Sequence, residues 1–446
     1  MPSSSTPAPG ASGPELYRRA KQRIPGGTQL LSKRPEMFLP DQWPAYYSRA
    51  EGCTVWDLDG RPLVDFTSCG IGCCLLGYAD PSVNAAVVAR LARGSMCTLN
   101  SPDEFALAEL LCALHPWAEQ VRYARAGGEA MSIAIRLARA ATRRDVVAFC
   151  GYHGWSDWYL AANLGETTAL NGHLLPGLDP AGVPAGLRGT TLPFRYNQIA
   201  ELEAIVASHR GQLAAIVMEP MRHDPPREGF LERVRALADE AGAVLVFDEI
   251  TSGWRSHHGG IHLTLGVNPD VAVFAKAISN GFPMAAVIGR RAVMEAAQQS
   301  FVSSTYWTEA IGPAAALATL QQLRQLDAVT LLREAGEATR AGWRRLGAKH
   351  GLPLKVGGLP ALATFAFDAG DDSRALMTLF TQGMLERGYL ANGVFYPMIV
   401  HTRAVIDAYL AAVDDVFADL RRARDEDRVR ASLRGPVAHS GFARLT

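Results

Sequence analysis

Hydrophobic residues follow two patterns in the middle of the chain. Short runs that are almost wholly apolar predict strands at 145–150, 213–218, 243–247 and 271–274. Segments whose apolar residues recur at helical spacing predict helices at 129–142 and 231–241. Continuous apolar strands are typical of parallel sheets that are covered on both faces, and strands that alternate with helices indicate an α/β domain.

Towards both ends of the chain the pattern is more mixed. Helices are predicted at 15–24, 81–93, 102–114, 310–326 and 404–421. Residues 51–66 alternate on either side of Asp59-Gly60, a dipeptide that favours a tight hairpin turn. Short strands are predicted within 354–368 and 388–400. These last segments predict a smaller C-terminal unit that combines strands with helices.

The composition is that of an ordinary globular protein. The 446 residues include 44 Lys+Arg and 44 Asp+Glu, and 48% are hydrophobic. A formal charge of zero argues against a nucleic-acid surface, because such surfaces need concentrated positive charge. No apolar run approaches the ~20 residues of a membrane helix, and residues 1–10 lack the charged and apolar segments of a signal peptide. We therefore expect a cytoplasmic protein with neither nucleic-acid nor membrane partners.

Neither the cysteines nor the histidines predict a disulfide framework or a metal site. The seven cysteines are odd in number and contain no C-x-x-C pair, so we expect reduced thiols. His257, His258 and His262 lie close together in the sequence. However, Gly259-Gly260 interrupts any helix there, and no second group of ligands has metal spacing. We expect no metal.

Two segments combine a strand or helix end with polar chemistry. Arg125-Ala-Gly-Gly-Glu-Ala130 precedes a strongly helical run, where glycines let a phosphate approach unpaired N–H groups, although a plain turn and cap fits as well. The strand at 243–247 is followed by Asp248 and Glu249. Successive strand side chains point to opposite faces, so one acid can reach a site while the other needs another partner. Alternatively, both acids are solvated at the strand end.

A third segment supplies a lysine. Lys276 follows the strand at 271–274, where it is either solvated or desolvated, and a desolvated lysine is a Schiff-base former. It lies one predicted strand away from Asp248. A lysine, an acid and a phosphate-binding helix start together describe a pyridoxal phosphate site. The combination is far more specific than any one of its members.

The order of the short motifs resembles that of one enzyme family. The motifs are Gly127-Gly128-Glu129-Ala130, Tyr152-His153-Gly154, Glu219-Pro220, Phe247-Asp248-Glu249, Lys276 and Thr305. They are similar to those of the class III aminotransferases, in particular the branch that contains glutamate-1-semialdehyde aminomutase. The resemblance runs from Pro25 to the helix near Leu410. It implies a fold-type-I pyridoxal phosphate enzyme with a mostly parallel sheet, helices on both faces, and a smaller α+β domain from both chain ends.

The resemblance also implies how the chain is divided. We expect a disordered tail at 1–14, small-domain segments at 15–75 and 327–425, a large cofactor-binding domain at 76–326, and a second tail at 426–446. It further implies a homodimer with its sites at the subunit interface. Thr305 would then reach the cofactor phosphate from the neighbouring subunit.

Roles for the central residues follow from the same resemblance. Lys276 would hold pyridoxal phosphate as a Schiff base and then act as acid and base for the proton shift. Asp248 would bond the protonated pyridine nitrogen, which lets the ring accept electron density. Tyr152 would stack on the ring, and the backbone of Gly127 and Gly128 would hold the phosphate.

Three further residues are candidates for contacts with the substrate. For His153, packing beside the ring and a chemical role are both open. Glu219 supports the site rather than acting in catalysis. Lys33 stands where the aminomutases have an arginine that helps to bind the substrate carboxylate, and Leu30 stands where they have a serine.

Several departures from the family bear on the substrate. Ala126 replaces a serine, so a phosphate-binding hydroxyl is lost, and Gly70 or Ile71 replaces an aromatic residue. No acid lies between 389 and 400, where the aminomutases use one, and Tyr306 and Trp307 add bulk after Thr305. We therefore expect amino-group transfer between an amine or amino acid and an oxo acid, aldehyde or ketone. The alternatives are an intramolecular aminomutase, other pyridoxal phosphate chemistry, or a catalytically silent protein with this fold.

Overall fold

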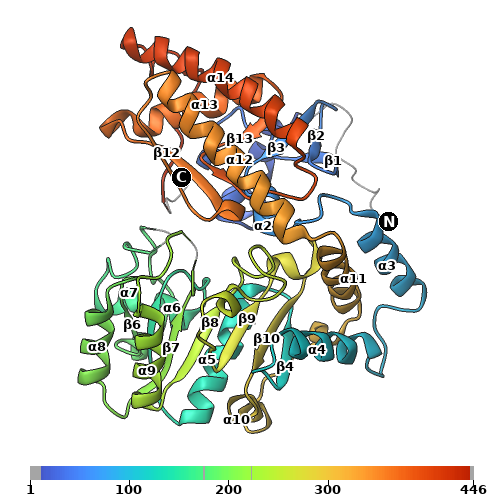
Figure 1. Ribbon diagram of the computed structural model, residues 1–446, viewed down its shortest axis with the longest axis vertical. Coiled ribbons are helices and arrows are strands. Elements are labelled where there is room, and N and C mark those ends of the chain that lie inside the picture. The colour runs from blue at the N-terminus through green and yellow to red at the C-terminus, as the bar shows by residue number, and fades with distance from the viewer. Residues whose placement is uncertain (1–11, 174–175, 222, 442–446) are drawn as a thin grey trace. The chain divides into compact units, whose positions relative to one another are not determined.

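The structure is a computed structural model that describes residues 12–173, 176–221 and 223–441 (Figure 1). The chain forms two compact units. Unit 1 comprises Met1–Ile71, Leu76–Asp80 and Leu331–Thr446, and unit 2 comprises Gly72–Leu75 and Pro81–Thr330. Most of the expected tail at 1–14 lies outside the described residues.

Unit 2 contains a seven-stranded sheet in the order β4-β10-β9-β8-β7-β5-β6. The strands are β4 (Gln120–Ala124), β5 (Val146–Cys150), β6 (Thr191–Pro193), β7 (Leu213–Met218), β8 (Val244–Asp248), β9 (Val271–Phe274) and β10 (Ala285–Gly289). Strands β6, β5, β7, β8 and β9 pair in parallel, whereas β10 is antiparallel to both of its neighbours. The predicted parallel α/β sheet is confirmed, and β4, β6 and β10 are additions to the predicted strands.

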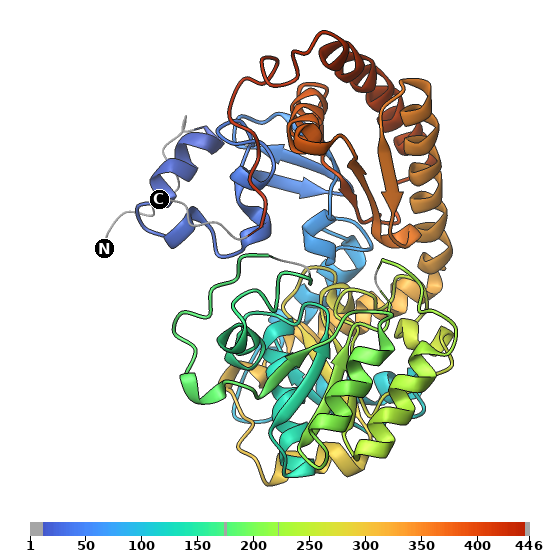
Figure 2. The ribbon, with the colours of Figure 1, turned by 90° about the vertical axis from the view of Figure 1, so that its left-hand side faces the viewer.

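Helices cover both faces of this sheet (Figures 1 and 2). The helices of unit 2 are α3 (Pro81–Ala92), α4 (Pro102–Leu114), α5 (Gly127–Thr142), α6 (Asp157–Leu160), α7 (Ala162–Gly165), α8 (Ile199–Ser208), α9 (Phe230–Ala241), α10 (Arg291–Met294) and α11 (Ile311–Gln325). Alternate strand residues pack into two apolar clusters. Val147, Val217 and Val246 join the cluster that contains α5. Ala148, Ile216 and Leu245 join the cluster that contains α9. Burial on both faces explains why these strands are apolar throughout.

Unit 1 contains two small sheets. One has the order β1 (Tyr47–Glu51), β2 (Thr54–Asp57), β3 (Pro62–Phe66) and β13 (Tyr389–Ala391), and the other has the order β11 (Leu354–Gly357), β12 (Ala363–Phe367) and β14 (Val394–Phe395). The predicted hairpin turn at Asp59-Gly60 joins β2 to β3, and Gly60 has a φ of 78°. Strand β13 pairs in parallel with β3, so residues from both ends of the chain share one sheet.

The helices of unit 1 differ from the prediction in extent. They are α1 (Gly13–Ala20), α12 (Ala328–Lys349, of which 331 onwards belongs to this unit), α13 (Ser373–Glu386) and α14 (Arg403–Asp425), and the short α2 (Cys69–Gly72) runs on into unit 2. The expectation that 426–446 is a free tail is wrong for its described part. Val429 and Ala438 are buried, and the His439 N–H donates to the Glu36 carbonyl.

Helix α12 was not predicted, and its glycines explain why. Glycine inside a helix is usually unfavourable, and this helix contains Gly336, Gly342 and Gly347. In the structure a Cβ at Gly336 would lie 1.8 Å from the Pro360 carbonyl oxygen, and one at Gly347 would lie 2.3 Å from Leu354. These glycines allow close packing of the helix and do not end it.

The described residues were also compared with what a membrane-spanning helix and a metal site require. No helix in the described part of the chain is both long enough and apolar enough to cross a membrane. Among the same residues, no cluster of three or more His, Cys, Asp or Glu is arranged to hold a metal ion.

Candidate functional site

The predicted site residues of unit 2 gather at one edge of the sheet. Tyr152 follows β5, Glu219 follows β7, Asp248 ends β8 and Lys276 follows β9. All four strands are parallel, so their carboxyl ends meet at the same edge, where α/β proteins bind ligands. Asp248 pairs directly with Val273 of β9, which confirms that Lys276 lies on the strand next to the acid.

Asp248 is a buried carboxylate with two fixed hydrogen bonds. Only 3% of its surface is exposed. Its Oδ1 accepts from the Ile250 N–H at 3.0 Å, and its Oδ2 lies 2.8 Å from His153 Nδ1. Each carboxylate oxygen has two lone pairs, so both bonds leave room for a further donor.

His153 is the partner that stabilises this acid. Its Nδ1 faces Asp248, and its Nε2 lies 3.0 Å from the Cys150 carbonyl oxygen. Both ring nitrogens of His153 therefore face oxygen atoms, one from a side chain and one from the backbone. The stacked ring of Trp158, 6.1 Å away at 22°, holds the imidazole in place. Neither of the two roles left open for His153 describes this contact, in which the imidazole is the hydrogen-bonding partner of Asp248.

Glu249 points to the opposite face, as the strand geometry predicts. It is fully buried, and its Oε1 accepts from His262 Nδ1 at 2.7 Å and from the His262 N–H at 2.9 Å. Burial alone raises the pKa of Glu249, but the bonds from His262 and Ser252 outweigh burial and hold the pKa below its usual value. Trp117 donates to His262 Nε2, so the proton of that neutral ring is on Nδ1. Glu249 therefore belongs to the core, and the expectation that both acids are solvated is wrong.

Lys276 has an unusual backbone and a fixed amine. Its φ is +50°, a left-handed conformation that costs a non-glycine residue roughly 1–3 kcal/mol and is concentrated at functional sites. Its side chain is half-buried, and Nζ donates a hydrogen bond to Thr251 Oγ1 at 2.8 Å. Thr251 was not predicted, although it follows Asp248 by only three residues.

The start of α5 lies against the turn that carries Asp248. The helix begins at Gly127, and its cap residue Ala126 makes no side-chain hydrogen bond. The first N–H groups of a helix have no partner within it, which makes this end an anion site. A Cβ on Gly127 would lie 2.9 Å from Ile250 Cδ1, so any larger residue here would force the end of the Ile250 side chain to move. The acid and the helix start are thus held together by direct packing.

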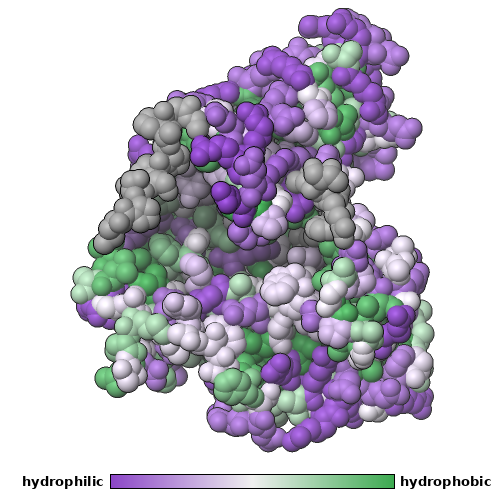
Figure 3. All heavy atoms as spheres, turned by 180° about the vertical axis from the view of Figure 1, so that it is seen from behind, coloured by the Kyte–Doolittle hydropathy of each residue, from purple (hydrophilic) through white to green (hydrophobic). Residues whose placement is uncertain are grey.

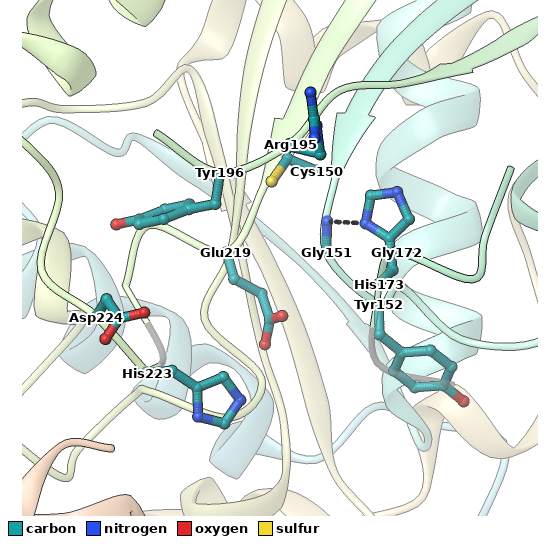
Figure 4. A pocket seen from close by; sticks show the side chains of 10 residues that line it. All are labelled: Cys150, Gly151, Tyr152, Gly172, His173, Arg195, Tyr196, Glu219, His223 and Asp224. Atoms are coloured by element: carbon teal, nitrogen blue, oxygen red, sulfur yellow. Dashed lines mark hydrogen bonds between the residues drawn. The ribbon is translucent and has the colours of Figure 1, made fainter. Parts of the chain in front are cut away.

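Tyr152 and Glu219 line a pocket of about 280 Å³, whose described lining includes neither Asp248 nor Lys276. Figure 4 shows the Glu219 and His223 side chains extending towards the middle of the pocket, between Tyr196 and Tyr152. Among the described residues, its lining is Cys150, Gly151, Tyr152, Gly172, His173, Arg195, Tyr196, Glu219, His223 and Asp224. Burial, followed by the charge of His153, lowers the pKa of His173 to about 4, so His173 is neutral and accepts from the Gly151 N–H at 3.1 Å.

Two predicted site residues are not joined to this group by any described contact. Lys33 is exposed in a short 3-10 helix (Leu31–Lys33) of unit 1, and Thr305 is exposed in another (Thr305–Thr308) of unit 2. Glu309, whose role the sequence left open, forms an ion pair with Arg125 at 2.8 Å. It also accepts from the Ile311 and Gly312 N–H groups, so it caps α11.

Comparison with known proteins identifies the family. A family model described as class-III aminotransferase matches residues 40–417. The chain belongs to the class III aminotransferases. This membership confirms the resemblance inferred from the motifs and makes the protein an enzyme of the transaminase family.

Similar proteins include both transferases and an isomerase. This aminotransferase is 34% identical over 393 residues to 2'-deamino-2'-hydroxyneamine transaminase of Streptomyces kanamyceticus, a match covering 85% of this chain and 93% of the relative. It is 33% identical over 430 residues to glutamate-1-semialdehyde 2,1-aminomutase of Roseiflexus castenholzii, covering 92% and 97%. The FumI protein of Sphingopyxis sp. MTA144, solved in its PLP internal aldimine form, has a TM-score of 0.84 and 28% identity, covering 93% and 98%.

The aminotransferase uses pyridoxal phosphate, and it has the predicted fold-type-I architecture. The residues at the sheet edge fit this cofactor. Lys276 supplies an amine, Asp248 with His153 supplies a buried anion, and the start of α5 supplies unpaired N–H groups. Pyridoxal phosphate carries a carbonyl that bonds an amine, a pyridinium that pairs with an anion, and a phosphate that accepts from N–H groups.

Proposed function

We propose that this aminotransferase moves an amino group between two separate substrates, an amine or amino acid and an oxo acid, aldehyde or ketone. The observation that carries the proposal is the joint placement of Lys276, Asp248 and the start of α5 at one sheet edge. Lys276 lies one strand from Asp248, and Gly127 packs against Ile250 in the turn that follows the acid.

We assign the cofactor contacts to residues of unit 2. Asp248 bonds the pyridine nitrogen and His153 holds that carboxylate in place by a hydrogen bond, while Tyr152 stacks on the ring. Gly127 and Gly128 hold the phosphate through their N–H groups. Bound pyridoxal phosphate supplies an electron-accepting ring that acidifies the substrate C–H bond. Lys276 anchors the cofactor and, once its amine is released, moves a proton at Nζ.

We also propose a homodimer in which Thr305 reaches the partner's phosphate. Exposed large apolar side chains support a partner surface, because isolated soluble proteins rarely expose them together. In unit 2 these are Val88, Leu91, Met96, Leu99, Phe105, Trp155, Phe301, Tyr306 and Leu326. Hydrophobic residues gather in green patches on the face seen in Figure 3.

The remaining assignments concern the substrate and the compartment. Lys33 is proposed to bind an anionic group of the substrate, since it stands in place of a substrate-binding arginine. Glu219 is proposed as a supporting residue, consistent with its position in the pocket beside Tyr152. A cytoplasmic location is proposed because the seven cysteines, odd in number and without a C-x-x-C pair, do not resemble a disulfide framework.

The second candidate is an intramolecular aminomutase. It is favoured by the likeness to a glutamate-1-semialdehyde 2,1-aminomutase over 92% of this chain. Against it, residues 389–400 contain no acid, and Leu30 and Lys33 replace the serine and arginine of that branch. Transfer between separate substrates therefore remains the main proposal.

A donor screen that follows the cofactor spectrum tests the choice. The holoenzyme is mixed with single donor amines or amino acids while its absorbance is recorded, and acceptors are then added. Conversion to the pyridoxamine form, with release of the donor's carbonyl product, supports transfer. A substrate that gives an isomeric product, with no acceptor present, supports the aminomutase. If no donor converts the cofactor, transfer is the wrong reaction.

A further inference from the structure

We propose that Thr251 is a positioning residue for Lys276, because its hydroxyl holds the lysine amine on the side of the sheet where Asp248 lies. Thr251 Oγ1 accepts from Lys276 Nζ at 2.8 Å. The two residues are 25 apart in sequence and come from the ends of the neighbouring strands β8 and β9. The inference rests on the proposed function, in which Lys276 is the residue that bonds the cofactor.

The turn that carries Thr251 is rigid. Thr251 is only 5% exposed, and its carbonyl accepts from Arg255 Nε at 2.6 Å. The Gly253 N–H bonds to the Glu249 carbonyl, and the Ile250 N–H bonds to Asp248. A β-branched side chain on a fixed backbone has few rotamers, so the position of the hydroxyl is fixed as well.

The hydroxyl of Thr251 is directed towards a side chain, unlike many other buried or half-buried threonine hydroxyls in this protein. Thr142, Thr339 and Thr378 each donate to a carbonyl four residues earlier in their own helices. That is the ordinary local bond of a threonine in a helix. Thr251 instead contacts the amine of Lys276. A role limited to stabilising its own turn does not require this contact.

The chemistry of a hydroxyl suits a nitrogen that gains and loses a proton. A hydroxyl accepts a hydrogen bond from an ammonium and donates one to a neutral amine. Thr251 can therefore keep its contact with Nζ while Lys276 takes up a proton and gives it back. A free lysine side chain carries about 2 kcal/mol of rotamer entropy. A fixed hydrogen-bond partner lowers the entropy that the side chain still has to lose when it reaches a reactive geometry.

The test compares Thr251→Val, which keeps the shape but removes the hydroxyl, with Thr251→Ser, which keeps the hydroxyl. Thr142→Val is the matched control, since it removes a hydroxyl bonded only to the Ala138 carbonyl in the hydrogen bonds described. One readout needs no turnover: apoenzyme is mixed with pyridoxal phosphate, and the Lys276 adduct is followed by absorbance and by mass after borohydride reduction. The second readout is the isotope effect of a donor deuterated at its reacting carbon.

Loss of a hydrogen bond to a charged group costs roughly 10- to 100-fold in rate. We therefore expect Thr251→Val to form the adduct about 10-fold or more slowly, with a lower kcat, a KM within about threefold, and a larger isotope effect. Thr251→Ser is expected to recover most of the rate, and Thr142→Val to match the wild type.

The outcomes separate this inference from the proposed function. If Thr251→Val behaves like the wild type in both readouts, the positioning role is overturned. If the wild type itself forms no adduct with pyridoxal phosphate, the proposed function fails. Should Thr251→Val not fold, Thr251→Ala against Thr251→Ser makes the same comparison, and equal rates in that pair overturn the inference.

Discussion

Asp248 and Glu249 are chemically similar neighbours that serve different purposes. Asp248 bonds His153 on one face of the sheet, while Glu249 bonds His262 on the other. The two-residue period of a strand sends them apart. Each acid meets its own histidine, which for Asp248 is 95 residues away in the sequence and for Glu249 is 13 residues away.

Asp248 and His153 are expected to act as a unit. Asp248→Asn should lower kcat by on the order of 100-fold or more, because a neutral amide does not keep the pyridine nitrogen cationic. His153→Asn should cost less, roughly 10- to 100-fold, as supporting partners of metal ligands do. Steady-state kinetics of both single variants and the double variant measure the effect. A double variant that equals the product of the two single effects would show that the residues act independently.

His115 makes stability depend on pH. Burial lowers the pKa of His115 to about 4, while Nδ1 bonds the Leu111 carbonyl and Nε2 accepts from the Gly260 N–H. Below pH ~6.5 the unfolded chain binds a proton that the folded ring refuses until about pH 4. The contribution of His115 is therefore complete above pH 6.5 and is lost as the pH falls towards 4.

The variant His115→Gln tests this pH dependence. Glutamine can donate and accept hydrogen bonds but does not titrate. The His115→Gln protein should therefore be about 1–3 kcal/mol less stable than the wild type at pH 7.5. The difference in free energy of unfolding should shrink as the pH falls from 6.5 to 4. Urea denaturation at a series of pH values measures it. A difference that stays constant with pH would contradict the assignment.

At the scale of elements, α5 connects the sheet to the cofactor. Its N-terminus begins at Gly127 and packs against Ile250, directly after Asp248. The cap position holds Ala126, which offers no side-chain acceptor or hydroxyl. Phosphate binding at this helix end is therefore expected to depend on backbone N–H groups.

Restoring a hydroxyl at the cap should strengthen cofactor binding. We expect Ala126→Ser to lower the Kd for pyridoxal phosphate by about threefold to tenfold, the worth of one hydrogen bond of roughly 1 kcal/mol. Titration of apoenzyme followed by absorbance measures the Kd. Ala126→Val, which adds bulk without a hydroxyl, is the control and should not bind more tightly. Equal affinity of Ala126→Ser and wild type would place the phosphate elsewhere.

At the scale of the whole molecule, the proposed dimer makes Thr305 a residue of the partner's site. We expect a native mass of twice 48.0 kDa by light scattering. Lys276→Ala and Thr305→Asp should each be inactive as homodimers, the latter because a carboxylate repels the phosphate. Coexpression of the two should restore activity, because one site of each mixed dimer has both residues intact.

The coexpression experiment also tests the opposite arrangement, in which Thr305 belongs to the site of its own subunit. If Thr305 serves the site of its own subunit, every site in a mixed dimer lacks either Lys276 or a normal Thr305. Coexpression would then restore nothing. Replacing the exposed Phe301, which is 87% accessible, by Asp should weaken the dimer if this face is buried in it.

The sequence by itself determined the features that depend on local pattern. Apolar strands alternating with amphipathic helices predicted the parallel sheet of unit 2. The order of Gly127-Gly128, Asp248 and Lys276 predicted the cofactor. Strand periodicity also predicted that Asp248 and Glu249 diverge, because neighbouring side chains on a strand must point to opposite faces.

Tertiary structure decided what depends on contacts between distant segments. It made His153 the partner of Asp248 and Thr251 the partner of Lys276, pairs separated by 95 and 25 residues. It kept α12 helical despite three glycines, because close packing outweighs helix propensity. Such pairings have no local signature, since a hydrogen bond or a close approach between remote residues exists only once the fold has brought them together.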